Sequence, residues 1–240
     1  MPSGFPDAVR DLGIDLDAAT LDRFGRYRDL IAEAAVRFSL TAVRDPAGIE
    51  RRHFLESLAL GRLLASQGLL HEGTRLLDIG SGAGLPGLPL KLAWPRLRLS
   101  LLESNAKRAG FLRRVIEDLA LDDAEVLEGR AEDLGRDPAQ RESYDLVTAR
   151  AVAPLPVLIE YALPFLRLDG RLAALKGSGV PRELEDAAGG LSELGGSVEA
   201  SLPFEPPDGM PQTLVIIRKT APTPDRYPRR AGIPAKRPLA

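Results

Sequence analysis

The sequence predicts an α/β fold, with a Rossmann-like sheet of seven strands and an N-terminal helical cap. From residue 74 onward, short apolar runs alternate with amphipathic stretches, as expected when parallel strands are connected through helices. The residues before that point carry helical periodicity and no strand signal. A glycine-rich turn follows the first apolar run, which is typical of a ligand-binding loop in such folds.

Two amphipathic helices are predicted ahead of the first strand. Apolar residues such as Phe24 and Ile31 recur at three- and four-residue steps along 15–38. A second helix is predicted over 49–66, with apolar residues that give it a buried side. We interpret residues 1–72, which contain both helices, as the cap.

The seven predicted strands are short apolar runs bounded by turn residues. They are TRLLDI (74–79), LRLSLLE (97–103), AEVLEG (124–129), YDLVTA (144–149), GRLAALKG (170–177), SVEASLPF (197–204) and TLVIIRK (213–219). The helices between them are clearest at 105–119 and 154–166. Right-handed crossovers place every strand-to-helix loop on one edge of the sheet, where ligands bind in open α/β folds. We assign residues 73–220 to this domain and expect its chemistry in those loops.

Composition excludes several chemistries. The chain has no cysteine, which removes thiol nucleophiles, thiolate zinc sites and iron–sulfur clusters. Its two histidines, His53 and His71, are too few for a histidine-rich metal site, and we predict no metal. No apolar run approaches the roughly 20 residues that span a bilayer. We therefore expect a cytoplasmic protein with no membrane partner, and we favour a monomer.

Charge is distributed unevenly along the chain. Residues 218–240 carry a net charge of +6, which leaves −8 for the rest of a chain whose net charge is −2. A basic strip on an acidic body is expected of a protein that grips a polyanion at one place. A solvated terminal tail is the alternative. We treat 221–240 as a separate basic tail.

The glycine-rich segment 78–87 reads Asp-Ile-Gly-Ser-Gly-Ala-Gly-Leu-Pro-Gly and lies between a predicted strand and a helix. Alternate glycines let the backbone turn tightly and approach a ligand closely. The segment also fits G-x-G-x-x-G, so a nicotinamide dinucleotide site is the alternative. Asp78, two residues before Gly80, instead matches the D-x-G-x-G-x-G loop of S-adenosylmethionine-dependent methyltransferases. We therefore expect cofactor contacts from Asp78, Gly80 and Gly82.

Further cofactor contacts are expected after the next two strands. Glu103 ends the second strand, where a carboxylate can accept hydrogen bonds from a ribose diol. Ser104 or Asn105 should cap the following helix. Ala131 and Glu132 follow the third strand, and their loop should face the adenine.

Three side chains are candidates for positioning the reactants. Arg150 ends the fourth strand and Lys176 ends the fifth, where cations would meet phosphate, a guanine O6 or the cofactor carboxylate. Surface roles are the alternative for Lys176. His53 lies in the second helix, where a lone histidine is more often structural than catalytic.

Eight segments resemble the RsmG family, also called glucose-inhibited division protein B, of 16S rRNA guanine-N7 methyltransferases. They are SLTAVRDP (39–46), RHFLESL (52–58), LLDIGSGAGLPGLPL (76–90), ESNAKRAGFL (103–112), GRAEDL (129–134), YDLVTARAVAPL (144–155), AALKG (173–177) and YPRRAGIPAKRPL (227–239). The resemblance covers about residues 15–239. Ser39 departs from the asparagine usual in the family.

The resemblance implies the cofactor S-adenosylmethionine and a partner in 16S rRNA or the small ribosomal subunit. It also implies cofactor contacts from a set of residues along the strand edge, which are Gly80, Leu85, Glu103, Ser104, Asn105, Ala131, Glu132 and Arg150. The implied RNA contacts are Arg44, His53, Lys176, Arg229 and Arg230, to which the basic tail adds Lys236 and Arg237. Two alternatives remain: a methyltransferase of the same fold acting on a protein or small molecule, and a non-catalytic RNA-binding cofactor sensor.

Overall fold

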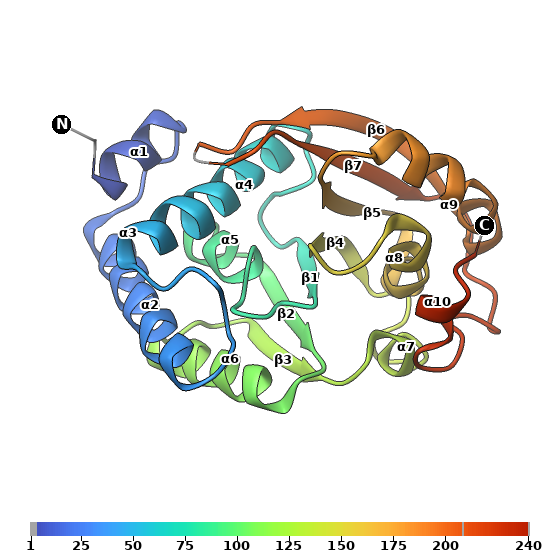
Figure 1. Ribbon diagram of the computed structural model, residues 1–240, viewed down its shortest axis with the longest axis horizontal. Helices are drawn as coiled ribbons and strands as arrows, with labels where there is room; N and C mark the ends of the chain where they lie inside the picture. The colour runs from blue at the N-terminus through green and yellow to red at the C-terminus, as the bar shows by residue number, and fades with distance from the viewer. Residues whose placement is uncertain (1–3, 208, 240) are drawn as a thin grey trace.

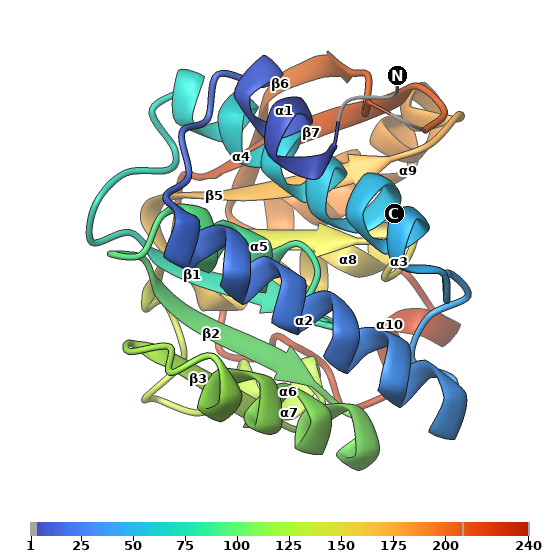
Figure 2. The same cartoon turned by 90° about the vertical axis from the view of Figure 1, so that its left-hand side faces the viewer.

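A seven-stranded sheet with helices on both faces forms the centre of the molecule in the computed structural model, which describes residues 4–207 and 209–239 (Figures 1 and 2). The strands are β1 (Arg75–Ile79), β2 (Arg98–Glu103), β3 (Ala124–Glu128), β4 (Tyr144–Arg150), β5 (Leu166–Lys176), β6 (Gly196–Phe204) and β7 (Gln212–Lys219). All seven predicted strands are confirmed. Their spatial order is β3-β2-β1-β4-β5-β7-β6, and β7 runs antiparallel to both of its neighbours.

The strand order reverses between β1 and β4. The chain first builds outward from β1 through β2 to β3 and then returns to add β4 on the other side of β1. Ligands of open α/β sheets bind at such a reversal, outside the carboxyl ends of the strands. The glycine-rich loop after β1 and Arg150 at the end of β4 therefore flank the expected binding position.

Helices cover the two faces of the sheet with separate hydrophobic cores. They are α1 (Phe5–Asp11), α2 (Ala18–Arg37), α3 (Pro46–Ile49), a π-helical turn η1 (Glu50–Leu55), α4 (Glu56–Ser66), α5 (Gly87–Ala93), α6 (Ala106–Asp118), α7 (Ala131–Leu134), α8 (Leu155–Ala162), a 3-10 turn η2 (Leu163–Phe165), α9 (Val180–Leu194) and α10 (Ile233–Lys236). One core packs α1 to α6 on the sheet, and the other packs α8 and α9 on the opposite face. Because both faces are covered, β1 is buried at four consecutive positions, from Leu76 to Ile79.

The cap helices share the first core with the sheet. Phe24, Tyr27 and Phe54 form an aromatic cluster in which the rings of Tyr27 and Phe54 stack with centroids 5.1 Å apart. This cluster continues into apolar side chains of β1, β2 and α5. The division into 1–72, 73–220 and 221–240 therefore stays a prediction about the sequence, because packing is continuous across residue 72.

Two predicted helices differ from the structure. The helix expected over 49–66 begins at Pro46 and contains a π-helical turn at Glu50–Leu55, a local widening that is frequent at functional sites. The helix expected over 154–166 ends at Ala162. Pro164 lacks the N–H that a longer helix would use, so the chain makes a 3-10 turn and then enters β5.

The basic tail is ordered against the body of the protein (Figure 1). The Arg141 guanidinium donates hydrogen bonds to the carbonyl oxygens of Thr223 and Tyr227, at 2.6 and 2.9 Å. The Tyr227 hydroxyl donates to Glu193 of α9 at 2.6 Å. These contacts hold the tail beside α7, α8 and α9.

Candidate active site

The glycine-rich loop after β1 follows a path that side chains would obstruct. Gly80, Gly82 and Gly84 all have positive φ, at 66°, 57° and 90°. A Cβ on Gly84 would lie 2.3 Å from a Leu88 methyl group and 2.8 Å from the Tyr27 hydroxyl oxygen. That hydroxyl donates a hydrogen bond to the carbonyl oxygen of Ala83. The cap helix α2 therefore fixes the loop from one side, which motif spacing alone could not reveal.

Asp78 lies beneath this loop and is fully buried. Its carboxylate accepts hydrogen bonds from the Thr148 hydroxyl at 2.9 Å and from the Gly87 N–H at 3.3 Å. Burial raises the pKa of Asp78 to about 6, and these hydrogen bonds and the charge of Arg150 oppose that rise. We expected Asp78 to contact the cofactor directly. Its carboxylate organises the loop from below, and direct contact of Asp78 with the cofactor stays a prediction.

Glu103 ties the end of β2 to the glycine-rich loop. Its two carboxylate oxygens accept hydrogen bonds from the N–H groups of Gly82 and Asn105, at 2.9 and 2.8 Å. The Asn105 side chain caps α6 by accepting from the next helical N–H groups, as predicted, while Ser104 is exposed beside it. Glu103 is only 4% exposed, and its carboxylate lies between two loops at the strand edge.

Ala131 and Glu132 begin α7, and both are buried. The Glu132 carboxylate accepts a hydrogen bond from the N–H of Gly232 at 2.8 Å. The Tyr161 hydroxyl of α8 is a second partner of this carboxylate. The tail therefore reaches the loop after β3, which we expected to face the adenine.

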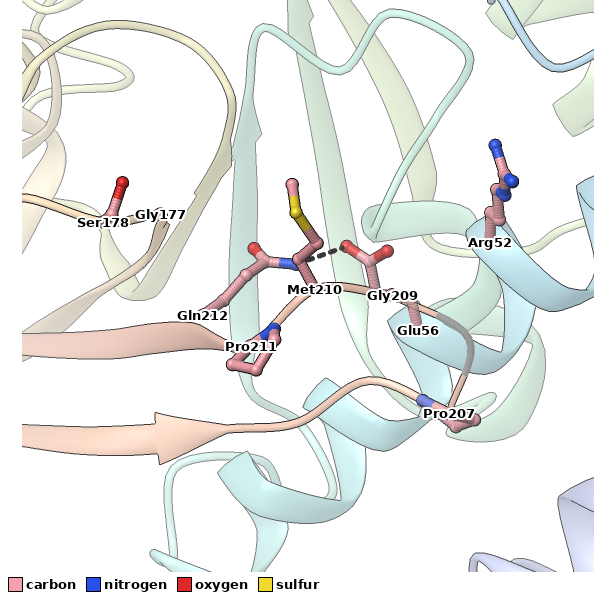
Figure 3. Close-up of a pocket in the computed structure, with 9 residues that line it drawn as sticks. All are labelled: Arg52, Glu56, Gly177, Ser178, Pro207, Gly209, Met210, Pro211 and Gln212. Carbon is pink, nitrogen blue, oxygen red and sulfur yellow. Dashed lines mark hydrogen bonds between the residues drawn. The ribbon is translucent and has the colours of Figure 1, made fainter.

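Arg150 meets an acidic partner that sequence reasoning missed. Its guanidinium is 3.2 Å from a carboxylate oxygen of Glu56, the first residue of α4. The side-chain amide of Gln212, at the start of β7, approaches the same oxygen at 3.5 Å (Figure 3). Three segments far apart in the sequence thus converge here. Glu56 lies in the segment RHFLESL, but nothing in the sequence marks Gln212.

Lys176 is held by the loops around the end of β5. Its ammonium group is 2.7 Å from Glu183 of α9 and donates to the carbonyl oxygen of Ala153 at 2.9 Å. Glu183 also accepts a hydrogen bond from the Leu155 N–H, at the start of α8. Lys176 therefore lies at the edge, as predicted, but its side chain is only 10% exposed and connects the end of β5 to the loop between β4 and α8 and to α9.

His53 is held in an uncharged state near Arg150. Its Nε2 is 2.8 Å from the Thr41 hydroxyl, whereas Nδ1 is buried with no partner among the described residues. Burial, and secondarily the positive charge of Arg150, lower the pKa of His53 to about 4. A histidine with this pKa is neutral at physiological pH, so it lacks the second ring proton that it would need to act as an acid. The structural interpretation is therefore favoured for His53.

An open hollow of about 1100 Å³ lies where α4, β5 and the β6–β7 turn meet. Its described lining residues, drawn in Figure 3, are Arg52, Glu56, Gly177, Ser178, Pro207, Gly209, Met210, Pro211 and Gln212. The Met210 side chain is 84% exposed at its rim. Because Gly177 follows β5 and Gln212 begins the antiparallel β7, the hollow lies at the same sheet edge as the glycine-rich loop.

The predicted RNA contacts divide into two groups. Arg44, Arg230, Lys236 and Arg237 are exposed. Arg229 differs, because its guanidinium forms a two-pronged ion pair with the fully buried Glu160 and also donates to the Arg237 carbonyl oxygen. The interpretation of Arg229 as an RNA contact is revised. The positive charge of Arg229 is paired with the negative charge of Glu160, and a buried carboxylate needs such a partner.

Metal-binding clusters and membrane-spanning helices are both absent from the described residues. The described ranges 4–207 and 209–239 contain no group of three or more histidine and acidic side chains arranged to hold a metal ion. Among the helices of these same residues, none combines the length and apolar character needed to cross a bilayer.

The chain is similar to a large set of known proteins. A family model described as "rRNA small subunit methyltransferase G" matches residues 20–201. Proteins named ribosomal RNA small subunit methyltransferase G from Chloroflexus aggregans and from Roseiflexus sp. strain RS-1 are 50% and 47% identical to it. The first alignment covers 95% of this chain and 93% of the relative, and the second covers 97% of each.

Solved structures with lower sequence identity share the fold. A mutant of MtNAS, crystallised in complex with S-adenosylmethionine, aligns with a TM-score of 0.56 at 19% identity over 90% of this chain and 88% of that one. A methyltransferase from Aquifex aeolicus described as SAM-dependent aligns with a TM-score of 0.53 at 20% identity, over 73% and 94%. The fold prediction is confirmed, and the chain belongs to the rRNA small subunit methyltransferase G family.

Proposed function

We propose that this protein transfers a methyl group from S-adenosylmethionine to N7 of a guanine in the 16S rRNA of the small ribosomal subunit. The observation that carries the proposal is the near full-length similarity to proteins named ribosomal RNA small subunit methyltransferase G. The sequence motifs shared with guanine-N7 methyltransferases support the position of methylation. The arrangement of the strand edge supports the chemistry, as follows.

The residues at the ends of β1, β2 and β3 fit S-adenosylmethionine. The loop around Gly80 and Gly82 keeps backbone open to a ligand, because a Cβ at Gly82 would meet only one carbonyl oxygen, at 3.8 Å. Glu103 has further lone pairs with which to accept hydrogen bonds from a ribose diol. Glu132, with Ala131 beside it, offers an acceptor to an adenine amino group. When bound, this cofactor supplies an electrophilic methyl group on a sulfonium centre.

Guanine N7 carries an available lone pair at neutral pH, so no side chain has to remove a proton before it reacts. His53 is therefore not needed as a base, and its Nε2 is bonded to the Thr41 hydroxyl. The protein's contribution is then orientation of two bound reactants, which can supply on the order of 7–11 kcal/mol of the barrier. Arg150 and Lys176 are positioned for that role by their ion pairs.

Exposed cations provide contacts for the RNA backbone. Arg44 lies in the loop before α3, and Arg230, Lys236 and Arg237 lie along the tail. Aromatic residues make up 5% of the chain, which favours recognition of a structured RNA through its shape and phosphates over base stacking.

We further propose that the enzyme acts as a cytoplasmic monomer. Its large exposed apolar side chains, including Val36, Leu168 and Met210, lie on different elements, and exposed apolar residues do not by themselves mark an interface. Light scattering at micromolar concentration should give the mass of one 25.9 kDa chain. A stable mass of twice that value would contradict the monomer.

Transfer of a labelled methyl group tests the function. Purified protein, labelled S-adenosylmethionine and small subunits from bacteria lacking the activity should give 16S rRNA whose digest contains labelled 7-methylguanosine. Large subunits serve as the control substrate and should remain unlabelled. If the protein binds the cofactor but labels no RNA, assembled or naked, then the substrate proposal fails while the fold assignment stands.

A further inference from the structure

The hollow beside Arg150 contains polar groups that the fold itself leaves unused. One carboxylate oxygen of Glu56 is engaged by Arg150 and Gln212, whereas the other has no hydrogen-bond partner among the described residues. The Glu56 side chain is 14% exposed, so most of its surroundings are protein. A partly buried carboxylate with an open oxygen facing a hollow is suited to accept donors from a ligand.

The hollow is connected to the cofactor loop through Arg150. Arg150 is the last residue of β4. The residue before it, Ala149, pairs with Ile79 of β1, just before the glycine-rich loop. The charge of Arg150 acts on Asp78 beneath that loop and on Tyr27 beside it. Glu56 therefore sits one side chain away from the machinery that we assign to the cofactor. A base bound in the hollow would lie next to the cofactor site.

We propose that this hollow is the binding site of the acceptor guanosine nucleotide, and that Glu56 is the residue that selects guanine. The proposal rests on the function proposed above and adds to it the residues that read the base. Guanine presents two adjacent donors, N1–H and the 2-amino group, which a carboxylate can accept together. Adenine presents an acceptor at N1, which a carboxylate repels. N7 lies on a different edge of the purine and stays free to react.

The other lining residues complete the match to a nucleotide. The 3.5 Å contact between Gln212 and Glu56 is weak enough to exchange, and the released amide can donate to guanine O6. Arg52 lies at the rim, where a guanidinium suits a phosphate group. The flexible, exposed Met210 side chain can pack on the face of a flat base.

Glu56 would also interact more strongly with guanine as the reaction proceeds. Methylation at N7 leaves positive charge on the purine, which makes N1–H a stronger donor. A carboxylate bound at that edge therefore stabilises the transition state more than the ground state. No second carboxylate is then needed to stabilise the positive charge that develops on the purine.

Methyl NMR of Met210 tests the site directly. The chain has two methionines, Met1 and Met210, so a protein labelled with ¹³C at the methionine methyl groups gives few signals, and the variant Met210→Leu identifies the one from the hollow. Titration with GMP, with cofactor present, should shift the Met210 signal saturably. GMP should bind about tenfold or more tightly than AMP, with IMP, which lacks the 2-amino group, in between.

Variants then assign the recognition to Glu56. The substitution Glu56→Gln should remove most of the preference for GMP over AMP. The control Glu199→Gln changes a carboxylate that also pairs with an arginine, Arg171, but at the middle of β5 and away from the hollow, and should preserve the preference. Arg52→Ala should weaken GMP severalfold and guanosine hardly at all.

Either of two results overturns the proposal: GMP at millimolar concentration leaves the Met210 signal unmoved, or wild-type protein binds AMP as tightly as GMP. The ligand series uses the wild-type chain, so it remains decisive even if Glu56→Gln fails to fold. Because binding of GMP requires no methyl transfer, these results are independent of the labelling assay. If the labelling assay gives 7-methylguanosine but GMP does not bind, the proposed nucleotide site is wrong and the proposed function still holds.

Discussion

The two halves of the strand edge are built on different principles. In the cofactor half, formed by the loops after β1, β2 and β3, acidic side chains accept hydrogen bonds from backbone N–H groups that shape the loops. Glu103 accepts from two backbone N–H groups, and Glu132 accepts from the tail. In the hollow between α4 and β7, by contrast, Glu56 keeps an open oxygen, and Arg52 is exposed.

The difference matches what each half has to hold. A small cofactor of fixed shape is served by a preorganised loop whose geometry needs little adjustment. A nucleotide that arrives as part of a large RNA needs a site with free donors and acceptors at an open surface. The basic tail shows the same division on a smaller scale, with Arg229 bound inward to Glu160 and its neighbour Arg230 exposed.

Removing Arg229 should have the largest effect on stability. Arg229→Ala leaves the buried Glu160 without its partner, and breaking a buried pair in this way costs about 3–5 kcal/mol of the free energy of unfolding. Urea unfolding measures the loss. The neighbouring variant Arg230→Ala is the matched control and should change stability by less than about 0.5 kcal/mol. If both variants lost the same free energy of unfolding, Arg229 would have no special structural role in the tail.

Acid should destabilise the protein through His53. The pKa of His53 is about 4 in the folded state against an ordinary value of 6.5, so the unfolded chain binds the extra proton between these values. Its contribution to stability is present above pH 6.5 and is lost as the pH falls toward 4, by about 3 kcal/mol in all. The variant His53→Gln should therefore become progressively more stable relative to wild type as the pH falls from 6.5 to 4.

Comparison with the variant is necessary because Asp78 works in the opposite direction. Its raised pKa of about 6 makes the folded state take up a proton at moderately acid pH, which favours folding as the pH falls. The two effects partly cancel in wild type. A constant stability difference between wild type and His53→Gln from pH 7 to pH 4 would show that His53 is not held uncharged.

The exposed tail cations should affect RNA affinity and leave folding unchanged. Replacing Arg230, Lys236 and Arg237 by alanine removes three charges with no partner side chain among the described residues. If each contacts a phosphate, the slope of log affinity for 16S rRNA against log salt concentration should become shallower by about 2–3. Filter binding across a salt series measures the slope, and an unchanged slope would remove the tail from the RNA interface.

The sequence was sufficient to predict the sheet and to place the glycine-rich loop and Glu103 along one edge of it. Both depend on local patterns, because a strand, a glycine turn and a helix follow each other directly in 74–93. Glu103 could be placed because parallel strands end at a common edge. A cap from Ser104 or Asn105 was predicted for the same local reason, and Asn105 provides it.

The hollow could not be predicted, because its residues are brought together only by tertiary structure. Glu56 and Gln212 are 156 positions apart, and neither belongs to a recognisable chemical motif by itself. The inward role of Arg229 was also hidden, since its partner Glu160 lies in α8, in a part of the sequence that reads as an apolar helix. Charge counting along the tail therefore overestimated the cations available to RNA.

Calorimetric titration of S-adenosylmethionine into two variants tests the division of the edge most directly. Glu103→Gln should weaken cofactor binding about 30-fold or more, because it alters charge-assisted hydrogen bonds at the centre of the cofactor half. Glu56→Gln should change cofactor affinity less than about threefold, since glutamine can still accept a hydrogen bond from Arg150. If Glu56→Gln loses the cofactor while Glu103→Gln keeps it, the two halves have been assigned the wrong way round.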